Sequence, residues 1–202
     1  MKLFRRSPDA RDRWIIVGLG NPGERYATNR HNAGAMVLHE LLERASARLK
    51  SHKSGCLVSE VNVGGQSAVL ARPMSYMNES GRPIRELLRW YKVGPERLIV
   101  VHDELDVPFG EVRLKSGGGT AGHNGLASLA SHLGTKDFLR VRVGISRPPG
   151  RQDPADYVLS DFSAAQKKEL SDLLGRAADA VERIVQEGAQ SAMNEFNARL
   201  KS

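Results

Sequence analysis

Apolar residues recur along the chain with two periods, and the two periods alternate from segment to segment. Residues 14–19 form an almost unbroken apolar run that predicts a strand, and residues 32–49 carry apolar positions at helical spacing. Residues 56–63 and 67–71 predict two more strands, joined by a turn at Gly64–Gly65.

The second half of the chain continues the alternation. Residues 79–92 predict a helix, 97–102 a buried strand, and 139–145 a strand whose alternating arginines indicate one wet face. A long apolar stripe over 170–185 predicts a helix. Ser163 and Gln166 form a capping box at its start, and Gly188 is a natural stop.

Strands that alternate with helices indicate an α/β fold. We expect a single-domain α/β/α sandwich with a central, twisted, mixed and mostly parallel sheet. The domain is expected to cover residues 14–202, with residues 1–13 as a basic, disordered N-terminal arm.

Composition narrows the class of protein. With 202 residues, 40% hydrophobic and 26% charged, the chain has the balance of a soluble protein, and no apolar run approaches the roughly 20 residues of a membrane helix. The N-terminal segment lacks the apolar core of a secretory signal, and the lone Cys56 suits a reducing cytoplasm. The net charge of +7 favours a phosphate-rich partner such as nucleic acid, although a solubilising surface is an alternative.

A glycine pattern after the first strand raises the possibility of a dinucleotide cofactor. Gly18, Gly20 and Gly23 have the G-x-G-x-x-G spacing of the phosphate-binding turn in Rossmann folds. Two features argue against a nucleotide-dependent oxidoreductase: Pro22 has no N–H to offer a phosphate, and no acidic residue follows at the end of a second strand.

Four segments contain more polar residues than packing requires, and each segment lies where a predicted strand ends or a predicted helix begins. In open α/β sheets such positions gather at one edge, so we expect a shared cleft. The segments are residues 19–34, 72–81, 101–110 and 113–126.

Within these segments, His31 and Asp103 suggest acid–base chemistry. A histidine that a carboxylate orients can accept a proton near neutral pH. Because no nucleophile elbow is present and Cys56 lies in an apolar strand pattern, the pair points to an activated water; a merely structural His31 is the alternative. Asn21, Asn78 and Asn124 offer a donor and an acceptor each, which suits a peptide backbone or an ester carbonyl, but also suits turns.

Two further interpretations concern a metal site and a nucleotide-phosphate site. A metal site is suggested by His102, Asp103, Glu104 and Asp106. Strand alternation would place Asp103 on the opposite side from the other three, and no second ligand cluster has recognisable spacing, so no metal is expected. The glycine-rich segment 116–122 lacks the Gly-Lys-Ser/Thr of a nucleotide P-loop.

Basic side chains flank this glycine-rich segment. Lys115 immediately precedes it, and Arg140 and Arg142 lie on a later predicted strand. Together they would form a basic rim; solvated surface charge is the alternative for each residue.

Taken together, the motifs resemble the bacterial-type peptidyl-tRNA hydrolase family, in order and spacing, from about Ile15 to Phe162. The matching stretches are "GLGNPGERYATNRHNAG", "RPMSYMNESG", "HDELDVPFGEVRLKSGGGTAGHNGL" and "FLRVRVGISRP". This resemblance implies a monomeric, cytoplasmic esterase without cofactor or metal. It would cut the ester between a peptide and the 3′-terminal ribose of tRNA and so recycle tRNA from stalled translation.

The resemblance also implies roles for individual residues. His31 would be the general base, Asp103 its orienting carboxylate, and Asn21 a positioning group for His31 and the tRNA 3′ end. Asn78 and Asn124 would hold the peptide backbone. The remaining matches are Tyr26 and Met77 lining the cleft, His123 supporting the site, and Lys115 and Arg142 clamping phosphate of the acceptor arm.

Two questions stay open at this stage. A non-catalytic RNA-binding relative of the same fold is the alternative function, although the joint presence of the four residues given catalytic roles argues against it. The second question is whether a mobile lid closes over the cleft, for which residues 146–157 are the candidate because they are rich in proline and glycine.

Overall fold

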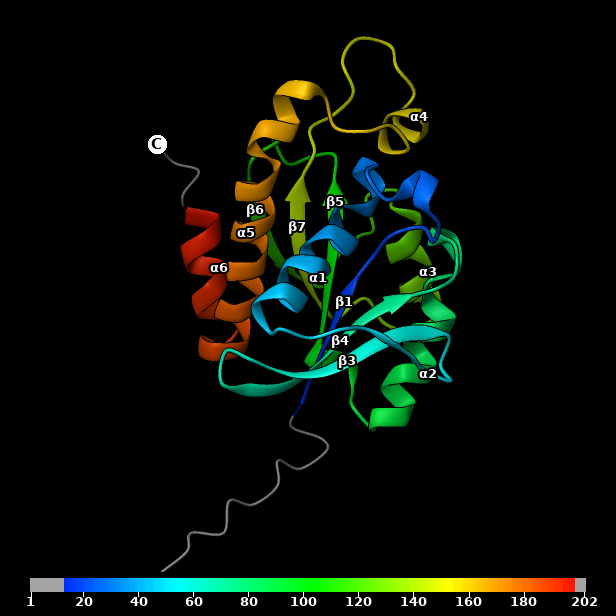
Figure 1. The fold of residues 1–202 in the computed structure, drawn as a ribbon, viewed down its shortest axis with the longest axis vertical. Coiled ribbons are helices and arrows are strands. Elements are labelled where there is room, and N and C mark those ends of the chain that lie inside the picture. Colours follow the sequence, from blue (N-terminus) through cyan, green and yellow to red (C-terminus); the bar gives the residue numbers. More distant parts are fainter. Residues whose placement is uncertain (1–12, 199–202) are drawn as a thin grey trace, which may run out of the picture.

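The computed structural model describes residues 13–198, and its strands form one sheet of seven strands in the order β2-β3-β4-β1-β5-β7-β6 (Figure 1). Apart from Arg13, the expected basic arm lies outside the described residues. The strands are β1 (Trp14–Gly18), β2 (Lys50–Ser51), β3 (Cys56–Val63), β4 (Gln66–Pro73), β5 (Leu98–Glu104), β6 (Val112–Ser116) and β7 (Leu139–Gly144).

The sheet is parallel in its middle and antiparallel at its edges. β1 pairs in parallel with β4 and β5, and β5 pairs in parallel with β7. β2 and β3 on one side and β6 on the other run antiparallel to their neighbours. The expected mixed α/β sheet is therefore confirmed. The carboxyl ends of its central parallel strands all lie at the same end of the sheet.

Helices cover both faces of the sheet, as Figure 1 shows. One apolar core joins the sheet to α1, α5 and α6, and a second joins it to α2 and α3. The helices are α1 (Ala33–Arg44), α2 (Gly81–Tyr91), α3 (Asn124–Leu133), α4 (Pro154–Val158), α5 (Ala164–Glu187) and α6 (Ala189–Ala198), with short 3₁₀ turns η2 (Glu24–Tyr26), η3 (Arg30–Asn32), η4 (Met77–Glu79) and η5 (Pro95–Arg97). Among residues 13–198, no helix is long and apolar enough to cross a membrane.

Alternation along β1 explains the two cores. Ile16 faces the α1 side while Ile15 and Val17 face the α2 side, and all three are fully buried. A strand buried on both faces has no polar alternation, which is why its sequence is a continuous apolar run.

The glycine pattern after β1 has a packing explanation. A methyl group on Gly18 would lie 2.4 Å from the carbonyl oxygen of Gly34 and 2.8 Å from Cβ of Leu38, so Gly18 lets α1 approach the strand. Gly20 is similarly close to Ala35, and Gly23 adopts φ +100°, a conformation that favours glycine. The spacing is therefore that of a tight strand-to-helix connection.

Two expected elements differ from the observed ones. The helix predicted over 32–49 ends at Arg44, because Ser46 adopts a left-handed φ of 49° and the chain then enters β2. The predicted wet face of residues 139–145 is wrong. Arg140 is only 2% exposed and Arg142 is half-buried, because the glycine-rich segment after β6 and the side chain of Glu104 contact them.

Candidate active site

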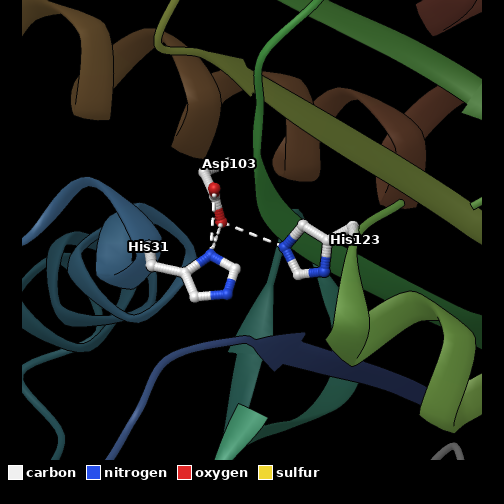
Figure 2. Close-up of side chains that lie close together, drawn as sticks. All are labelled: His31, Asp103 and His123. Atoms are coloured by element: carbon white, nitrogen blue, oxygen red, sulfur yellow. Dashed lines mark hydrogen bonds and ion pairs between the residues drawn. The ribbon is translucent and has the colours of Figure 1, made fainter. Parts of the chain in front are cut away.

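The carboxylate of Asp103 bridges two imidazoles at the carboxyl end of the central strand β5. Nδ1 of His31 lies 3.0 Å from both carboxylate oxygens of Asp103, and Nε2 of His123 lies 3.0 Å from Oδ1 (Figure 2). His31 comes from η3, which precedes α1, and His123 is the N-cap residue of α3. Figure 2 shows that the two rings approach Asp103 from different elements. The fold thus assembles the site from three separate segments.

Backbone contacts fix the proton positions in this cluster. Nδ1 of His123 accepts hydrogen bonds from the backbone N–H groups of Gly125 and Leu126, at 3.1 and 3.3 Å. Its proton must therefore be on Nε2, which donates to Asp103. His31 donates to the same carboxylate through Nδ1–H, which leaves the lone pair of its Nε2 available to accept a proton.

The pKa values in the cluster follow from burial and charge. Burial alone would raise the pKa of Asp103, but the adjacent His31 and His123 hold that pKa far below its usual range. Burial lowers the pKa of His31, yet the charge and hydrogen bond of Asp103 outweigh this and raise the pKa above 6.5. Asp103 is therefore an anion, and it stabilises the protonated form of His31.

A third histidine supports the cluster from the interior. His102 is 1% exposed, its Nδ1–H donates to the backbone carbonyl of Asp103 at 2.7 Å, and its ring packs edge-on against His123 with centroids 5.0 Å apart. Burial, together with the nearby His123, lowers the pKa of His102 to about 3, so it is neutral. A neutral ring here adds no charge beside His123.

His31, Asp103 and His123 are also of the residue types that bind metals, with ligand atoms within 4.8 Å of one another. A metal on Nε2 of His123 would have to replace the proton that the backbone contacts at Nδ1 require. The donor set therefore fits a hydrogen-bonded proton-transfer network better than a metal centre.

A cavity of about 310 Å³ lies beside this network. His31, Asp103, His123 and Asn124 line one side, and Leu105 and Val158 contribute apolar surface. α4 and the residue before it, Asp153, also line the cavity. The cavity is large enough for part of a substrate and places Asn124 beside the imidazoles.

Asn21 connects two of the predicted segments. Its side-chain oxygen accepts from the backbone N–H of Met77 at 2.8 Å, and its backbone N–H donates to Oδ1 of Asn32 at 2.9 Å. Asn32 also donates to the backbone carbonyl of Asn21. Asn21 thus holds the η4 loop against the turn that carries His31.

Asn78 lies outside the cavity of His31. It is exposed and borders a separate hollow with Arg82 and His132. Of the two predicted cleft residues, Met77 is buried in the core on the α2 side, and Tyr26 is half-buried with Arg25 over its ring. Their predicted roles stay predictions.

The two predicted phosphate-clamp residues differ in their availability. Lys115 is exposed on β6 and directly opposite Arg140 in the sheet. Nε of Arg142 donates to the buried carboxylate of Glu104 at 3.0 Å, so that nitrogen is already engaged.

Sequence reasoning missed Arg30, the residue before His31. Arg30 is buried, donates to Ser160 and Gln166 at 2.7 and 2.9 Å, and lies over the ring of Tyr157 at 4.1 Å. It therefore ties the His31 turn to α4, the wall of the cavity. The only signal was its position inside the motif "NRHNAG", because an arginine in a loop ordinarily predicts solvated charge.

Comparisons with known proteins point to one family. Residues 15–202 match the family model described as peptidyl-tRNA hydrolase. A peptidyl-tRNA hydrolase of Frankia alni is 59% identical over 187 residues, which cover 93% of this chain and 95% of the relative. A peptidyl-tRNA hydrolase of Pseudarthrobacter chlorophenolicus is 55% identical over 188 residues, which cover 92% of this chain and 96% of the relative. The crystal structure of peptidyl-tRNA hydrolase from Acinetobacter baumannii superposes with a TM-score of 0.86 at 35% identity, covering 93% of this chain and 96% of that one.

Proposed function

Because the chain belongs to the peptidyl-tRNA hydrolase family, it is an enzyme that hydrolyses peptidyl-tRNA, and we propose that His31 is its general base, with Asp103 as the orienting partner. The observation that carries this proposal is the 3.0 Å contact between Nδ1 of His31 and the buried carboxylate, beside the cavity. That contact leaves Nε2 free to take a proton from water.

The reaction would proceed by direct attack of water. Nε2 of His31 removes a proton as the water oxygen bonds to the ester carbonyl carbon, and Asp103 stabilises the imidazolium that forms. As the tetrahedral intermediate collapses, the bond to the 3′-oxygen of the terminal ribose breaks, and that oxygen leaves with the proton from His31. The products are a peptide with a free carboxyl group and deacylated tRNA. His123 keeps Asp103 in place, because Nε2–H of His123 donates a hydrogen bond to Oδ1 of Asp103.

The asparagines would divide the positioning work. Asn124 borders the cavity and is suited to hold the peptide carbonyl or the water. Asn21 fixes the geometry of the His31 turn and the η4 loop. Asn78, which lines a separate hollow, would contact a part of the substrate that extends away from the reacting bond. Tyr26 and Met77 would line the cleft.

The remaining parts of the proposal concern the RNA and the state of the protein. Lys115 and Arg142 would bind phosphates of the acceptor arm, and the net charge of +7 favours this contact. We further infer a cytoplasmic monomer in which residues 14–202 form one domain, in keeping with the single continuous sheet.

The proposal is tested with purified protein and N-blocked aminoacyl-tRNA, by following the release of free tRNA. His31→Ala should lower kcat by at least about a hundredfold, because general-base catalysis contributes factors of 10² to 10⁴. His39→Ala, on the exposed face of α1, is the matched control and should keep wild-type activity. Unchanged turnover in a folded His31→Ala protein would exclude His31 as the base.

A further inference from the structure

An exposed tryptophan lies near the end of α2, in a hollow separate from the cavity of His31. Trp90 is 51% exposed. It lines a hollow of about 390 Å³ together with His52, Lys53, Ser54, Glu86 and Arg89. None of these six residues lines the cavity beside the imidazoles. Tryptophan is enriched where proteins bind other molecules, because its ring combines a large apolar face with a polar N–H. The hollow is therefore a candidate binding site that hydrolysis at His31 does not explain.

Neighbouring groups support the ring of Trp90 along its edge. The imidazole of His52 packs edge-on against the indole, with centroids 5.6 Å apart, and stacks on the ring of Tyr91 at 6.0 Å. His52 begins the turn between β2 and β3, and its backbone N–H donates to the carbonyl of Cys56 at 2.9 Å. The indole thus forms a supported flat surface at the wall of the hollow.

The backbone also fixes the proton of His52. Its Nδ1 accepts a hydrogen bond from the backbone N–H of Ser54 at 3.2 Å, so the proton of the neutral ring is on Nε2. In the part of the chain that the structure describes, no acceptor is bonded to that Nε2. His52 therefore offers an N–H donor that the protein itself leaves unused.

The hollow carries a net positive charge. Lys53 and Arg89 are exposed cations on its wall, and Glu86 is its single acidic residue. Glu86 already pairs with Arg85 at 3.1 Å and lies 3.6 Å from Arg89. Nζ of Lys53 lies 3.4 Å from the centroid of the Trp90 ring, with no carboxylate at ion-pair distance within residues 13–198. A ligand with a negative charge and a flat apolar part complements this combination.

An unpaired nucleotide has both of these properties. Its base is a flat ring that stacks on an aromatic side chain, and its phosphate pairs with lysine and arginine. Because the lysine stem is flexible, the ammonium of Lys53 can move from the indole to a phosphate and leave a face of Trp90 to the base. An acidic peptide segment supplies the charge but not the flat base, so the hollow fits a nucleotide better.

We propose that this hollow binds one unpaired nucleotide of an RNA, with the base stacked on Trp90 and the phosphate bound by Lys53 and Arg89. Trp90 lies about 14 Å along α2 from the start of that helix, and Figure 1 shows α2 at the opposite end of the molecule from α4. The turn of Lys53 follows β2, whereas Lys115 is on β6, and these two strands are the opposite edges of the sheet. The nucleotide site is therefore separate from both the ester and the predicted phosphate clamp.

Tryptophan fluorescence tests the contact in the unaltered protein. Of the two tryptophans, Trp14 is 7% exposed and Trp90 is 51% exposed, so quenching by a stacked base reports on Trp90. Single-stranded oligoadenylate should quench the emission, and less so as the salt concentration rises. In Trp90→Phe, whose remaining emission comes from Trp14, the same RNA should leave the emission unchanged.

Polyglutamate is the matched ligand control, because it carries negative charge without bases. Equal quenching by polyglutamate and oligoadenylate would overturn the assignment to a nucleotide. Unchanged emission of the wild type, at oligoadenylate concentrations that saturate binding in a filter assay, would overturn the site itself.

Two variants separate stacking from charge. Trp90→Ala removes the stacking surface and should weaken the binding of oligoadenylate about tenfold. Lys53→Gln should lower the slope of log Kd against log salt by about 0.7, as expected for one phosphate contact to a single strand. Lys168→Gln, at an exposed position on α5, is the control and should change neither quantity. Wild-type affinity and salt slope in the two folded hollow variants would contradict the proposal.

A kinetic comparison identifies the RNA that supplies the nucleotide. If it belongs to the substrate, Trp90→Ala should lower kcat/KM for full-length N-blocked aminoacyl-tRNA relative to a substrate cut down to its 3′-terminal nucleotides. If it belongs to a separate RNA, this ratio should keep its wild-type value while the binding of oligoadenylate still weakens. His31→Ala should quench like the wild type, so a failure of the nucleotide site is distinct from a failure of the general base.

Discussion

At the scale of single residues, the site depends on Asp103 having two partners. One carboxylate oxygen accepts from both His31 and His123, and the latter is locked by the start of α3. Its two histidines are therefore not equivalent. His123 has both ring nitrogens occupied, whereas His31 keeps one free. The arrangement therefore supports the proposal that His31, and not His123, is the general base.

This asymmetry predicts a pH profile. His31 must be neutral to act as a base, so kcat/KM should fall tenfold per pH unit below its pKa, with a midpoint above 6.5 because Asp103 raises that pKa. In Asp103→Asn the raising charge is gone while burial still lowers the pKa. The midpoint should therefore move to lower pH, with a reduced plateau.

The measurement is the initial rate of tRNA release at low substrate between pH 5 and 9. His39→Gln serves as the control, because His39 is exposed on α1 and away from the cavity. If Asp103→Asn and the wild type shared one midpoint, Asp103 would not be the group that sets the pKa of His31.

At the scale of elements, the position of His31 depends on how closely α1 approaches β1. The 3₁₀ turn η3 carries His31 directly into α1, and Gly34 in the first turn of that helix would place a methyl group 2.2 Å from the carbonyl oxygen of Val101 on β5. On the other side, Arg30 fastens α4 to the same turn. The turn that carries His31 is thus held between the sheet and α4.

Close packing at Gly18 should make it intolerant of a methyl group. We expect Gly18→Ala to lower the free energy of unfolding by about 1–3 kcal/mol, because the added methyl group overpacks the contact with Gly34. Urea unfolding of the wild type and the variant measures the difference. Gly175→Ala is the matched control: it lies within α5, its nearest neighbour would be 3.7 Å away, and it should be neutral or stabilise by about 0.5–1 kcal/mol. Equal stability of the two variants would contradict the steric argument.

At the scale of the whole molecule, the sheet brings distant segments to one edge. Leu19 and Asn21 follow β1, Met77 follows β4, and Asp103 lies near the end of β5. Because these strands are parallel, their carboxyl ends meet, and α3 and α4 complete the site around them (Figure 1). This assembly leaves His102, on β5, buried at 1% exposure beneath the site.

His102 should make stability depend on pH. Its pKa is about 3 in the folded protein and ordinarily 6.5, so between these values the unfolded chain binds a proton that the native protein does not. Its contribution therefore lowers stability as the pH falls below 6.5. From pH 7 to pH 5, the wild type should lose up to about 2 kcal/mol more than His102→Asn, since one pKa unit corresponds to about 1.4 kcal/mol.

Urea unfolding at both pH values measures this difference between the two proteins. His31 has the opposite sign, but it is present in both and cancels in the comparison. Parallel losses of stability would show that His102 takes up a proton as easily in the folded protein as in the unfolded chain.

Most of the fold could be predicted from the sequence, because the signals are local. The strand 56–63, the capping box of Ser163 and Gln166 and the stop at Gly188 all appear where the sequence places them. The pairing of His31 with Asp103, implied by the family motifs, is likewise present in the structure. Such features depend on neighbouring residues along the chain, or on motifs long enough to identify a family.

Only the tertiary structure decided which side chains from distant segments come into contact. The sequence by itself determined the periods of the strands and helices, the glycines at the strand-to-helix turn and the residues of the family motifs. It could not place Arg140 inside the protein or Asn78 outside the cavity of His31. A side chain's burial and charge environment depend on which distant segments cover it, and local periodicity carries no record of those segments.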